Sequence, residues 1–274
     1  MNITSLLKLS LPLATVFLSS FCQPGNSALA NIAISPMILE TQAQRGQAKG
    51  IFTVSNLDEK AFRARVYTSP FTYDKEKGFQ ALTSSANDLA PYLQFSPREL
   101  QVEGSTQRSI RFITRFPPNL PDGEYRTMIF TENLQATTVS ETDKKRGVTV
   151  NTAIIPRIGV AVYVRKGNIS PNLVTNIARF NTQSSKLQLL VTNKGKASAI
   201  TSGEWKLKRG NQVVQTGNIG DTTIIAESDR YLSLTPSKSN QVQLTPGDYE
   251  LSGDLIWGDK KNTVPFKVIL TIPK

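Results

Sequence analysis

Short runs of alternating apolar and polar residues recur along most of this chain, and each run is bounded by glycine, proline, asparagine or aspartate. The runs include GIFTVSN (50–56), FRARVYT (62–68), YRTMIFT (125–131), KLQLLVTN (186–193) and TVPFKVILTI (263–272). Successive side chains of a strand point to opposite faces, so this alternation indicates strands with one buried face. The turn-forming boundaries return roughly every 8–12 residues, which is the spacing of a β-sandwich. No segment has a sustained helical period, so the sequence predicts an all-β fold.

Two halves of the chain repeat the same pattern. LPDGEY (120–125) returns as LTPGDY (244–249), and upstream of each stands a run that ends in VSN (54–56) or VTN (191–193). In immunoglobulin-like sandwiches a tyrosine at such a corner turns its hydroxyl back to upstream backbone. The repeat predicts two tandem immunoglobulin-like β-sandwich domains. A common turn sequence that arises twice by chance is the alternative.

The first thirty residues have the pattern of a signal peptide. A lysine precedes the apolar run Leu9–Cys22, which is too short to span a bilayer, and small residues follow at Ala28–Ala30. We expect residues 1–30 to be removed after about Ala30 and the protein to be exported without stable membrane insertion. A lipoprotein signal that ends at Cys22 is the alternative.

The boundary between the two predicted domains falls at RKGN (165–168), where charge, glycine and asparagine interrupt the apolar pattern. We therefore expect an N-terminal domain over residues 31–166 and a C-terminal domain over residues 169–274. A linker this short holds the two domains at a restricted angle and leaves a cleft between them. Binding sites tend to lie in such clefts.

The composition excludes several classes of chemistry. The chain has 274 residues with no histidine, and its single cysteine, Cys22, lies in the predicted signal peptide. Histidine-based triads, histidine-ligated metals and thiol catalysis are therefore excluded. We expect no enzyme activity and no cofactor. The net charge of +11 indicates a solvated basic surface or an acidic partner, and export argues against nucleic acid as that partner.

One extended segment is unusually long. Residues 148–164 read as a single strand, whereas strands usually run to roughly 5 or 6 residues. Pro156 interrupts the alternation and cannot donate a ladder hydrogen bond, so we expect two strands end to end. The earlier one, Val148–Ile154, would present an apolar ridge and an open edge, preceded by a polar loop over residues 133–147. Alternatively, it simply fills the core of its own domain.

Three segments, in order, resemble the periplasmic pilus-assembly chaperones of the PapD-like family: Ser96–Phe112, Leu120–Phe130 and Ile154–Val164. The resemblance covers roughly residues 32–165, and the second domain matches only in size and β character. It implies two immunoglobulin-like domains set in an L and a periplasmic location. It also implies donor-strand complementation, in which the last strand of the first domain lends alternating apolar residues to a pilin subunit that lacks its own final strand.

The resemblance assigns roles to particular residues. The donor positions fall on Val148, Val150 and Thr152, and Ile154 is the next residue on the same face of the strand. A basic residue that grips the C-terminal carboxylate of the subunit falls on Arg157, for which an exposed sheet arginine is the alternative reading. The family has a second anchoring arginine on the first strand, but Met37 stands in its place here, and Arg45 and Lys49 come later.

These observations predict a non-enzymatic periplasmic chaperone that binds subunits of pili or related surface structures during their assembly. An outer-membrane usher is a further candidate partner. The alternative is an exported structural or adhesive protein of two immunoglobulin-like domains that binds an acidic envelope polysaccharide through its basic surface.

Overall fold

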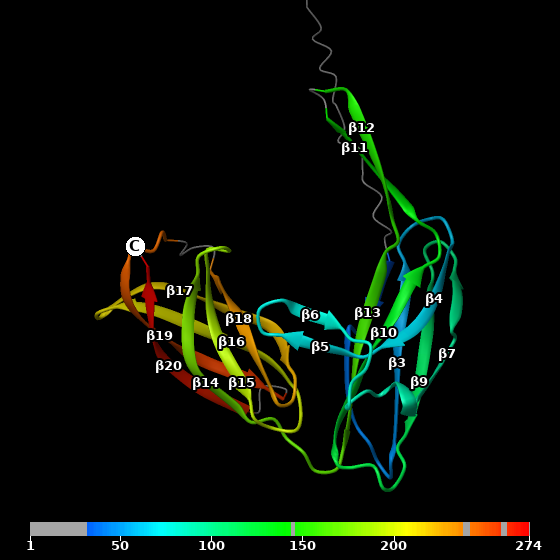
Figure 1. The fold of residues 1–274 in the computed structure, drawn as a ribbon, viewed down its shortest axis with the longest axis horizontal. Coiled ribbons are helices and arrows are strands. Elements are labelled where there is room, and N and C mark those ends of the chain that lie inside the picture. Colours follow the sequence, from blue (N-terminus) through cyan, green and yellow to red (C-terminus); the bar gives the residue numbers. More distant parts are fainter. Residues whose placement is uncertain (1–31, 144–145, 238–241, 259–261, 274) are drawn as a thin grey trace, which may run out of the picture.

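The computed structural model describes residues 32–143, 146–237, 242–258 and 262–273. Among these residues the chain is almost entirely β-structure, with one short 3-10 helix at Ala90–Tyr92 (Figure 1). The predicted signal peptide lies outside the described residues. The predicted all-β fold with two β-sandwich domains is confirmed, and the two domains are set at an angle to each other (Figure 1).

Two facing sheets form the first domain. Sheet A contains, in spatial order, β1 (Ile32–Ser35), β3 (Gln47–Asn56), β9 (Gln107–Arg115) and β7 (Leu93–Ser96). Sheet B contains β2 (Ile38–Gln42), β13 (Arg157–Lys166), β10 (Gly123–Asn133), β4 (Phe62–Ser69) and β8 (Glu99–Val102). Strand β2 pairs in parallel with β13, and the other strands of the two sheets pair antiparallel.

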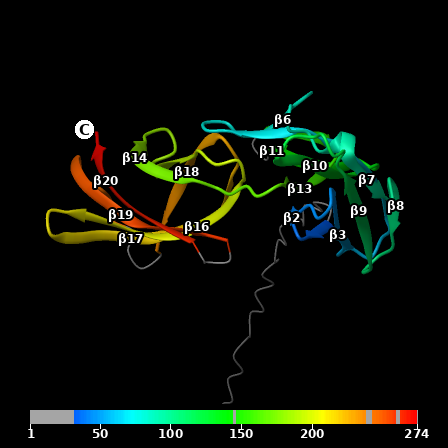
Figure 2. The same ribbon diagram turned by 90° about the horizontal axis from the view of Figure 1, so that it is seen from below.

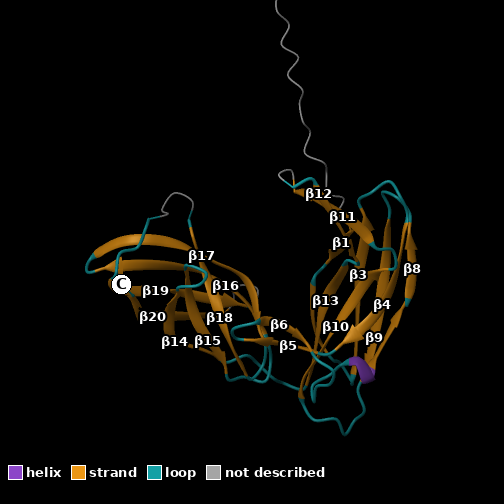
Figure 3. Ribbon diagram, turned by 45° about the horizontal axis from the view of Figure 1, so that its top comes forward, coloured by secondary structure: helices purple, strands orange, loops and turns teal. Residues whose placement is uncertain are grey.

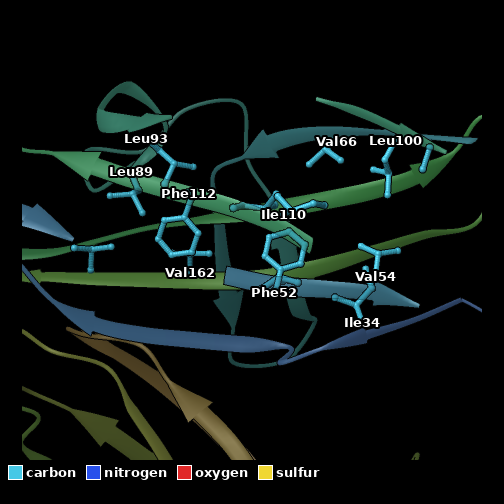
Figure 4. Close-up of a cluster of buried hydrophobic side chains, with 14 of the residues drawn as sticks. Ile34, Phe52, Val54, Val66, Leu89, Leu93, Leu100, Ile110, Phe112 and Val162 are labelled. Atoms are coloured by element: carbon cyan, nitrogen blue, oxygen red, sulfur yellow. The ribbon is translucent and has the colours of Figure 1, made fainter. Parts of the chain in front are cut away.

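The core of the first domain follows from the alternation. In β4, Phe62, Ala64 and Val66 are buried between the sheets, whereas Arg63 and Arg65 are exposed. The other strands of the two sheets likewise bury the apolar side chains of their inner faces. Figure 4 shows the resulting core, which contains Ile34, Phe52, Val54, Leu89, Leu93, Leu100, Ile110, Phe112 and Val162.

The second domain is one seven-stranded sheet around a core of its own. In spatial order its strands are β14 (Leu173–Asn181), β15 (Lys186–Asn193), β18 (Ser228–Pro236), β17 (Gln212–Ile224), β16 (Ala199–Arg209), β19 (Gly247–Trp257) and β20 (Asn262–Ile272). The core of the first domain ends at Val164 and that of the second begins at Leu173. The domain limits at residues 166 and 169 stay a prediction.

The repeated corner motifs have the predicted role. The Tyr125 hydroxyl donates to the carbonyl oxygen of Pro121 at 2.9 Å, and the Tyr249 hydroxyl donates to that of Thr245 at 2.8 Å. The asparagines of the upstream motifs, Asn56 and Asn193, are both buried and hydrogen-bond nearby backbone groups. Each corner therefore satisfies backbone groups that would otherwise lose their partners on burial.

Two hairpins leave the sandwich of the first domain. The hairpin of β5 (Phe71–Asp74) and β6 (Gly78–Ala81) reaches across to the second domain, as Figure 2 shows. The hairpin of β11 (Thr137–Asp143) and β12 (Val148–Ile154) projects beyond the end of sheet B (Figure 3).

The β5–β6 hairpin holds the two domains together through charge and aromatic contacts. Arg179 of β14 donates two hydrogen bonds to the carboxylate of Glu76, at 3.0 and 2.6 Å, and its guanidinium lies 3.6 Å from the ring centre of Tyr231. Arg230 of β18 lies 4.0 Å from the ring centre of Tyr73. The contacts of Arg179 with Glu76 and of Arg230 with Tyr73 join residues of different domains, so they limit the angle between the domains.

This hairpin contact should depend on pH. The hydrogen bond from Arg179 lowers the pKa of Glu76 below its ordinary value. A carboxyl group whose pKa is depressed by folding stabilises the folded state above its unfolded pKa, and that contribution is lost as the pH falls through the lowered value. We therefore expect Glu76→Gln to lower the melting temperature at neutral pH, and the difference from the parent to shrink as the pH falls below the ordinary glutamate pKa.

Thermal unfolding of both proteins over a pH series measures this difference. Arg179→Gln should give the same pH profile, because it removes the other half of the same contact. A difference that stays constant from neutral to acidic pH would show that the Glu76 carboxylate does not contribute through its charge.

Candidate functional site

The β12 strand is exposed along its whole length. The exposed fractions are 52% for Val148, 57% for Val150 and 38% for Ile154, and Thr152 between them is exposed as well. These are the four residues of the predicted donor strand, and they share one parity along the strand. The structure therefore presents a row of three large apolar side chains to solvent, at a place where the domain's own core does not reach.

Strand β12 pairs with one neighbour among the described residues. Its register with β11 runs without interruption from Val148 opposite Asp143 to Ile154 opposite Thr137. The other edge has no strand beside it in the described part of the chain. An exposed edge of this kind is a template for pairing with another polypeptide, which proteins usually prevent.

Two expectations about this region are corrected. The polar loop expected over residues 133–147 is wrong for Thr137–Asp143, which forms β11, because the backbone of this polar segment pairs with β12. The alternative that Val148–Ile154 fills the core of its own domain is also wrong, since every residue of β12 is exposed. The expected break into two strands is confirmed, because β12 ends at Ile154 and β13 begins at Arg157.

Arg157 lies at the base of the hairpin, on the outer face of sheet B. In β13 the even-numbered residues enter the core between the sheets, and Arg157 shares the opposite face with Ala161 and Tyr163. These two residues belong to a cluster that includes Ile225 of the second domain. The guanidinium of Arg157 is therefore on the face of sheet B that faces the second domain.

Two aromatic residues, Phe130 and Tyr67, form a shelf against which this guanidinium packs. The guanidinium carbon of Arg157 lies 4.8 Å from the ring centre of Phe130, and Nη1 donates to the Tyr67 hydroxyl at 3.4 Å. Gly159 makes room for the shelf, since a Cβ atom there would lie 2.9 Å from the Phe130 ring and 2.7 Å from the Met128 side chain. Stacking on a ring leaves the fork of an arginine free to bind an anion, because it uses the face of the guanidinium and not its N–H groups.

A carboxylate already lies beside Arg157. Glu132 of β10 accepts hydrogen bonds from Tyr67 at 2.7 Å and from Arg65, through Nε at 3.0 Å and Nη2 at 2.6 Å. The Tyr67 hydroxyl is the main cause that lowers the pKa of Glu132, and Arg65 and the charge of Arg157 act in the same direction, against desolvation. Two guanidinium groups and one carboxylate leave this cluster with a single positive charge.

The later basic residues do not replace the missing arginine of the first strand. Met37 is exposed, and its carbonyl oxygen accepts a hydrogen bond from the backbone of Ala161. Arg45 lies in the turn after β2, whose last residues pair with the far end of β13, and Lys49 lies in sheet A. Neither residue is placed on the face that carries Arg157.

The cleft expected between the domains is present as a cavity of about 540 Å³. Glu40 and Arg165 of the first domain line it, together with Ser198, Asp221 and Trp257 of the second. Arg157 is not among its lining residues, so the predicted anchor is on the shared face of sheet B but outside this cavity.

The described residues contain no group of acidic side chains placed to hold a metal ion. Within the same residues, no helix has both the length and the apolar character needed to cross a membrane.

No protein-family model matches the sequence, and a search of curated proteins finds no match. Several solved structures are similar to this one. The YadV chaperone has 12% sequence identity and a TM-score of 0.47, with 87% of this chain and 99% of that chain covered. The CsuC–CsuE chaperone–tip adhesion subunit complex of Acinetobacter baumannii has 12% identity and a TM-score of 0.47, with 89% and 100% covered. The periplasmic chaperone SfaE has 10% identity and a TM-score of 0.41, with 88% and 100% covered.

Each of these solved structures contains a protein described as a chaperone.

The sequence predicts the four candidate donor residues and the candidate anchor Arg157, but not the surroundings of Arg157. Nothing in the local sequence singles out Arg65, Tyr67, Phe130 or Glu132 as neighbours of Arg157. The alternation along β4 shows that Arg65 and Tyr67 share one face of that strand, and the alternation along β10 shows the same for Phe130 and Glu132. The register between β4 and β10 could not be predicted from the sequence, because it depends on pairing between segments far apart in the chain.

Proposed function

We propose that this protein is a non-enzymatic chaperone that binds subunits of pili or related surface structures by lending them its β12 strand. The observation that supports this most directly is the exposure of β12, which carries Val148, Val150 and Ile154 on one face and has an open edge. The three side chains would fill a groove in a subunit that lacks its own final strand, and the open edge would supply the backbone hydrogen bonds.

Arg157 would bind the C-terminal carboxylate of the subunit. Its guanidinium lies at the base of the β11–β12 hairpin, so a chain that ends there would continue outward beside β12. A guanidinium fork matches both oxygens of a carboxylate, and the terminal anchor would set which subunit residues meet the donor side chains.

The proposed place of action is the periplasm, after residues 1–30 have been removed. An outer-membrane usher that receives the loaded chaperone is part of the same proposal. No nucleotide is required, because a second strand can displace β12 from the subunit by forming the same contacts.

Hydrogen exchange of a co-expressed complex tests this proposal. We expect a one-to-one complex on gel filtration and slower exchange of the β12 amides in the complex than in the free protein, because a bound strand protects the open edge. The amides of β16, in the middle of the second-domain sheet, are the internal control and should not change. A stable complex with no added protection of β12 would contradict strand donation.

A further inference from the structure

Arg65, Glu132 and Arg157 form one row across three neighbouring strands. Glu132 is directly opposite Arg65 on one side and directly opposite Arg157 on the other, and all three lie on the outer face of sheet B. Side chains directly opposite on one face have Cβ atoms roughly 5 Å apart. The row therefore places a carboxylate between two guanidinium groups, at the edge where the sheet ends and the hairpin begins.

The two arginines of this row are engaged differently. Arg65 donates both Nε and Nη2 to the same oxygen of Glu132, and its side chain remains 56% exposed. Arg157 forms no ion pair within the described residues, and its guanidinium rests on Phe130 beside the Tyr67 hydroxyl. One guanidinium is thus neutralised by an internal carboxylate, while the other keeps its charge.

Tyr67 connects the two halves of the row. Its hydroxyl donates to Glu132 and accepts from Arg157, so the negative charge of Glu132 is one hydrogen-bonded group away from the guanidinium that carries the spare charge. A carboxylate that binds Arg157 would therefore lie close to the carboxylate of Glu132. Both groups are negative, so Glu132 would repel the bound carboxylate.

We propose that Arg65 and Arg157 form a two-arginine site for a carboxylate at the end of a polypeptide, and that Glu132 is an internal competitor that lowers the affinity of this site. This inference rests on the proposed function, because it concerns the same carboxylate. In this site Arg65 of β4 is the second positive group for the carboxylate, since the first strand of this chain has no basic residue. Glu132 keeps the affinity moderate, so that a bound subunit can be released.

A pair of synthetic peptides tests the inference without an identified subunit. The probe is a fluorescent nine-residue peptide of alternating valine and threonine with a free C-terminal carboxylate, and its partner is the same peptide with a C-terminal amide. Fluorescence anisotropy gives the affinity of each, and their ratio reports the carboxylate site alone. We expect the parent protein to prefer the free carboxylate, and Arg157→Gln to reduce this preference about tenfold or more.

Glu132→Gln has the same shape as the parent side chain but no charge. We expect it to strengthen binding of the carboxylate peptide by up to about fivefold, the upper end of the range for one charge interaction that water screens, and to leave the amide peptide unchanged. Arg65→Gln should weaken binding of the carboxylate peptide. In the double variant Arg65→Gln/Glu132→Gln this gain should be smaller, because Glu132→Gln then relieves the repulsion but releases no second guanidinium. Circular dichroism of each variant shows whether the fold is retained.

Glu99→Gln is the matched control. Glu99 lies opposite Arg65 in the same row, but it is one strand farther from Arg157 and its ion pair is with Arg63 at 3.6 Å. The same loss of charge at this position should leave the peptide ratio unchanged, so a gain equal to that of Glu132→Gln would indicate a general charge effect and overturn the inference.

The outcomes separate the inference from the proposed function. If Arg157→Gln lowers the ratio but Glu132→Gln does not raise it, or if the gain in the double variant is as large as that of Glu132→Gln alone, the two-arginine site is wrong and the anchor at Arg157 stands. If Arg157→Gln leaves the ratio unchanged, the anchor itself is wrong.

Discussion

Val150→Asp should abolish the complex between this protein and its subunit while leaving the free protein folded. Val150 is 57% exposed and lies outside both hydrophobic cores, so the substitution should change the free energy of unfolding by less than about 0.5 kcal/mol. In the complex the same side chain would enter an apolar groove, where an unpaired carboxylate is strongly unfavourable. We expect binding to weaken about hundredfold or more, which corresponds to about 3 kcal/mol.

Ala153→Asp is the matched control for this prediction. Ala153 is exposed, lies on the same strand, and has the opposite parity to Val150. The new charge would therefore point away from the groove, and the variant should bind within a few fold of the parent. Gel filtration of co-expressed proteins and calorimetry of the purified pair measure both variants. Equal binding by Val150→Asp and the parent would show that β12 does not donate its apolar ridge.

Glu124→Ala should cause the largest loss of stability among the contacts between the domains. The carboxylate of Glu124 is fully buried, accepts a hydrogen bond from the backbone of Ser198 at 2.8 Å, and is also bonded by the Ser198 hydroxyl and by Arg165, the latter at 3.3 Å. Removing this carboxylate leaves the buried backbone N–H of Ser198 without its acceptor and takes from Arg165 the buried one of its two carboxylate partners. We expect a loss of about 3 kcal/mol in the free energy of unfolding.

Because of where the tryptophans lie, the unfolding of the second domain can be followed separately by tryptophan fluorescence. Trp205 and Trp257, the two tryptophans of the chain, both lie in the second domain, whereas far-ultraviolet circular dichroism reports both domains. In the parent the two signals should change together on denaturation. In Glu124→Ala they should separate, because the contact that couples the domains has been removed.

Glu40→Ala is the control for Glu124→Ala. Glu40 also pairs with Arg165, at 3.3 Å, but its side chain is 27% exposed. A pair that water can reach contributes little, so we expect a loss below about 1 kcal/mol and no separation of the two signals. Equal losses in the two variants would show that the burial of Glu124 does not matter to the coupling of the domains.

Much of the fold was readable because it depends on local chemistry. The alternation in β4 specifies which side chains enter the core, and the residues of the two tyrosine corners are close enough in sequence to be recognised as a motif. Pro156 marks the break between β12 and β13, because its ring removes a backbone donor. The same parity predicts an apolar ridge on β12, and the exposure of every β12 residue agrees with a ridge outside the core.

The rest depends on which strands become neighbours. Strand β11 has a largely polar sequence without clear alternation, and its pairing with β12 makes it a strand. The contact of Glu76 with Arg179 joins residues about a hundred positions apart, and nothing in the sequence near either residue indicates the other.

The sequence by itself determined the β class of this protein, the inward and outward faces of most strands, and the position of an apolar ridge ahead of Arg157, because each of these depends on the order of residues within one segment. Only the tertiary structure decided that this ridge stands free of the core and that Arg65, Glu132 and Arg157 lie side by side. The physical reason is that register between strands is set by packing of the whole sandwich, so the charges it brings together cannot be found by reading along the chain.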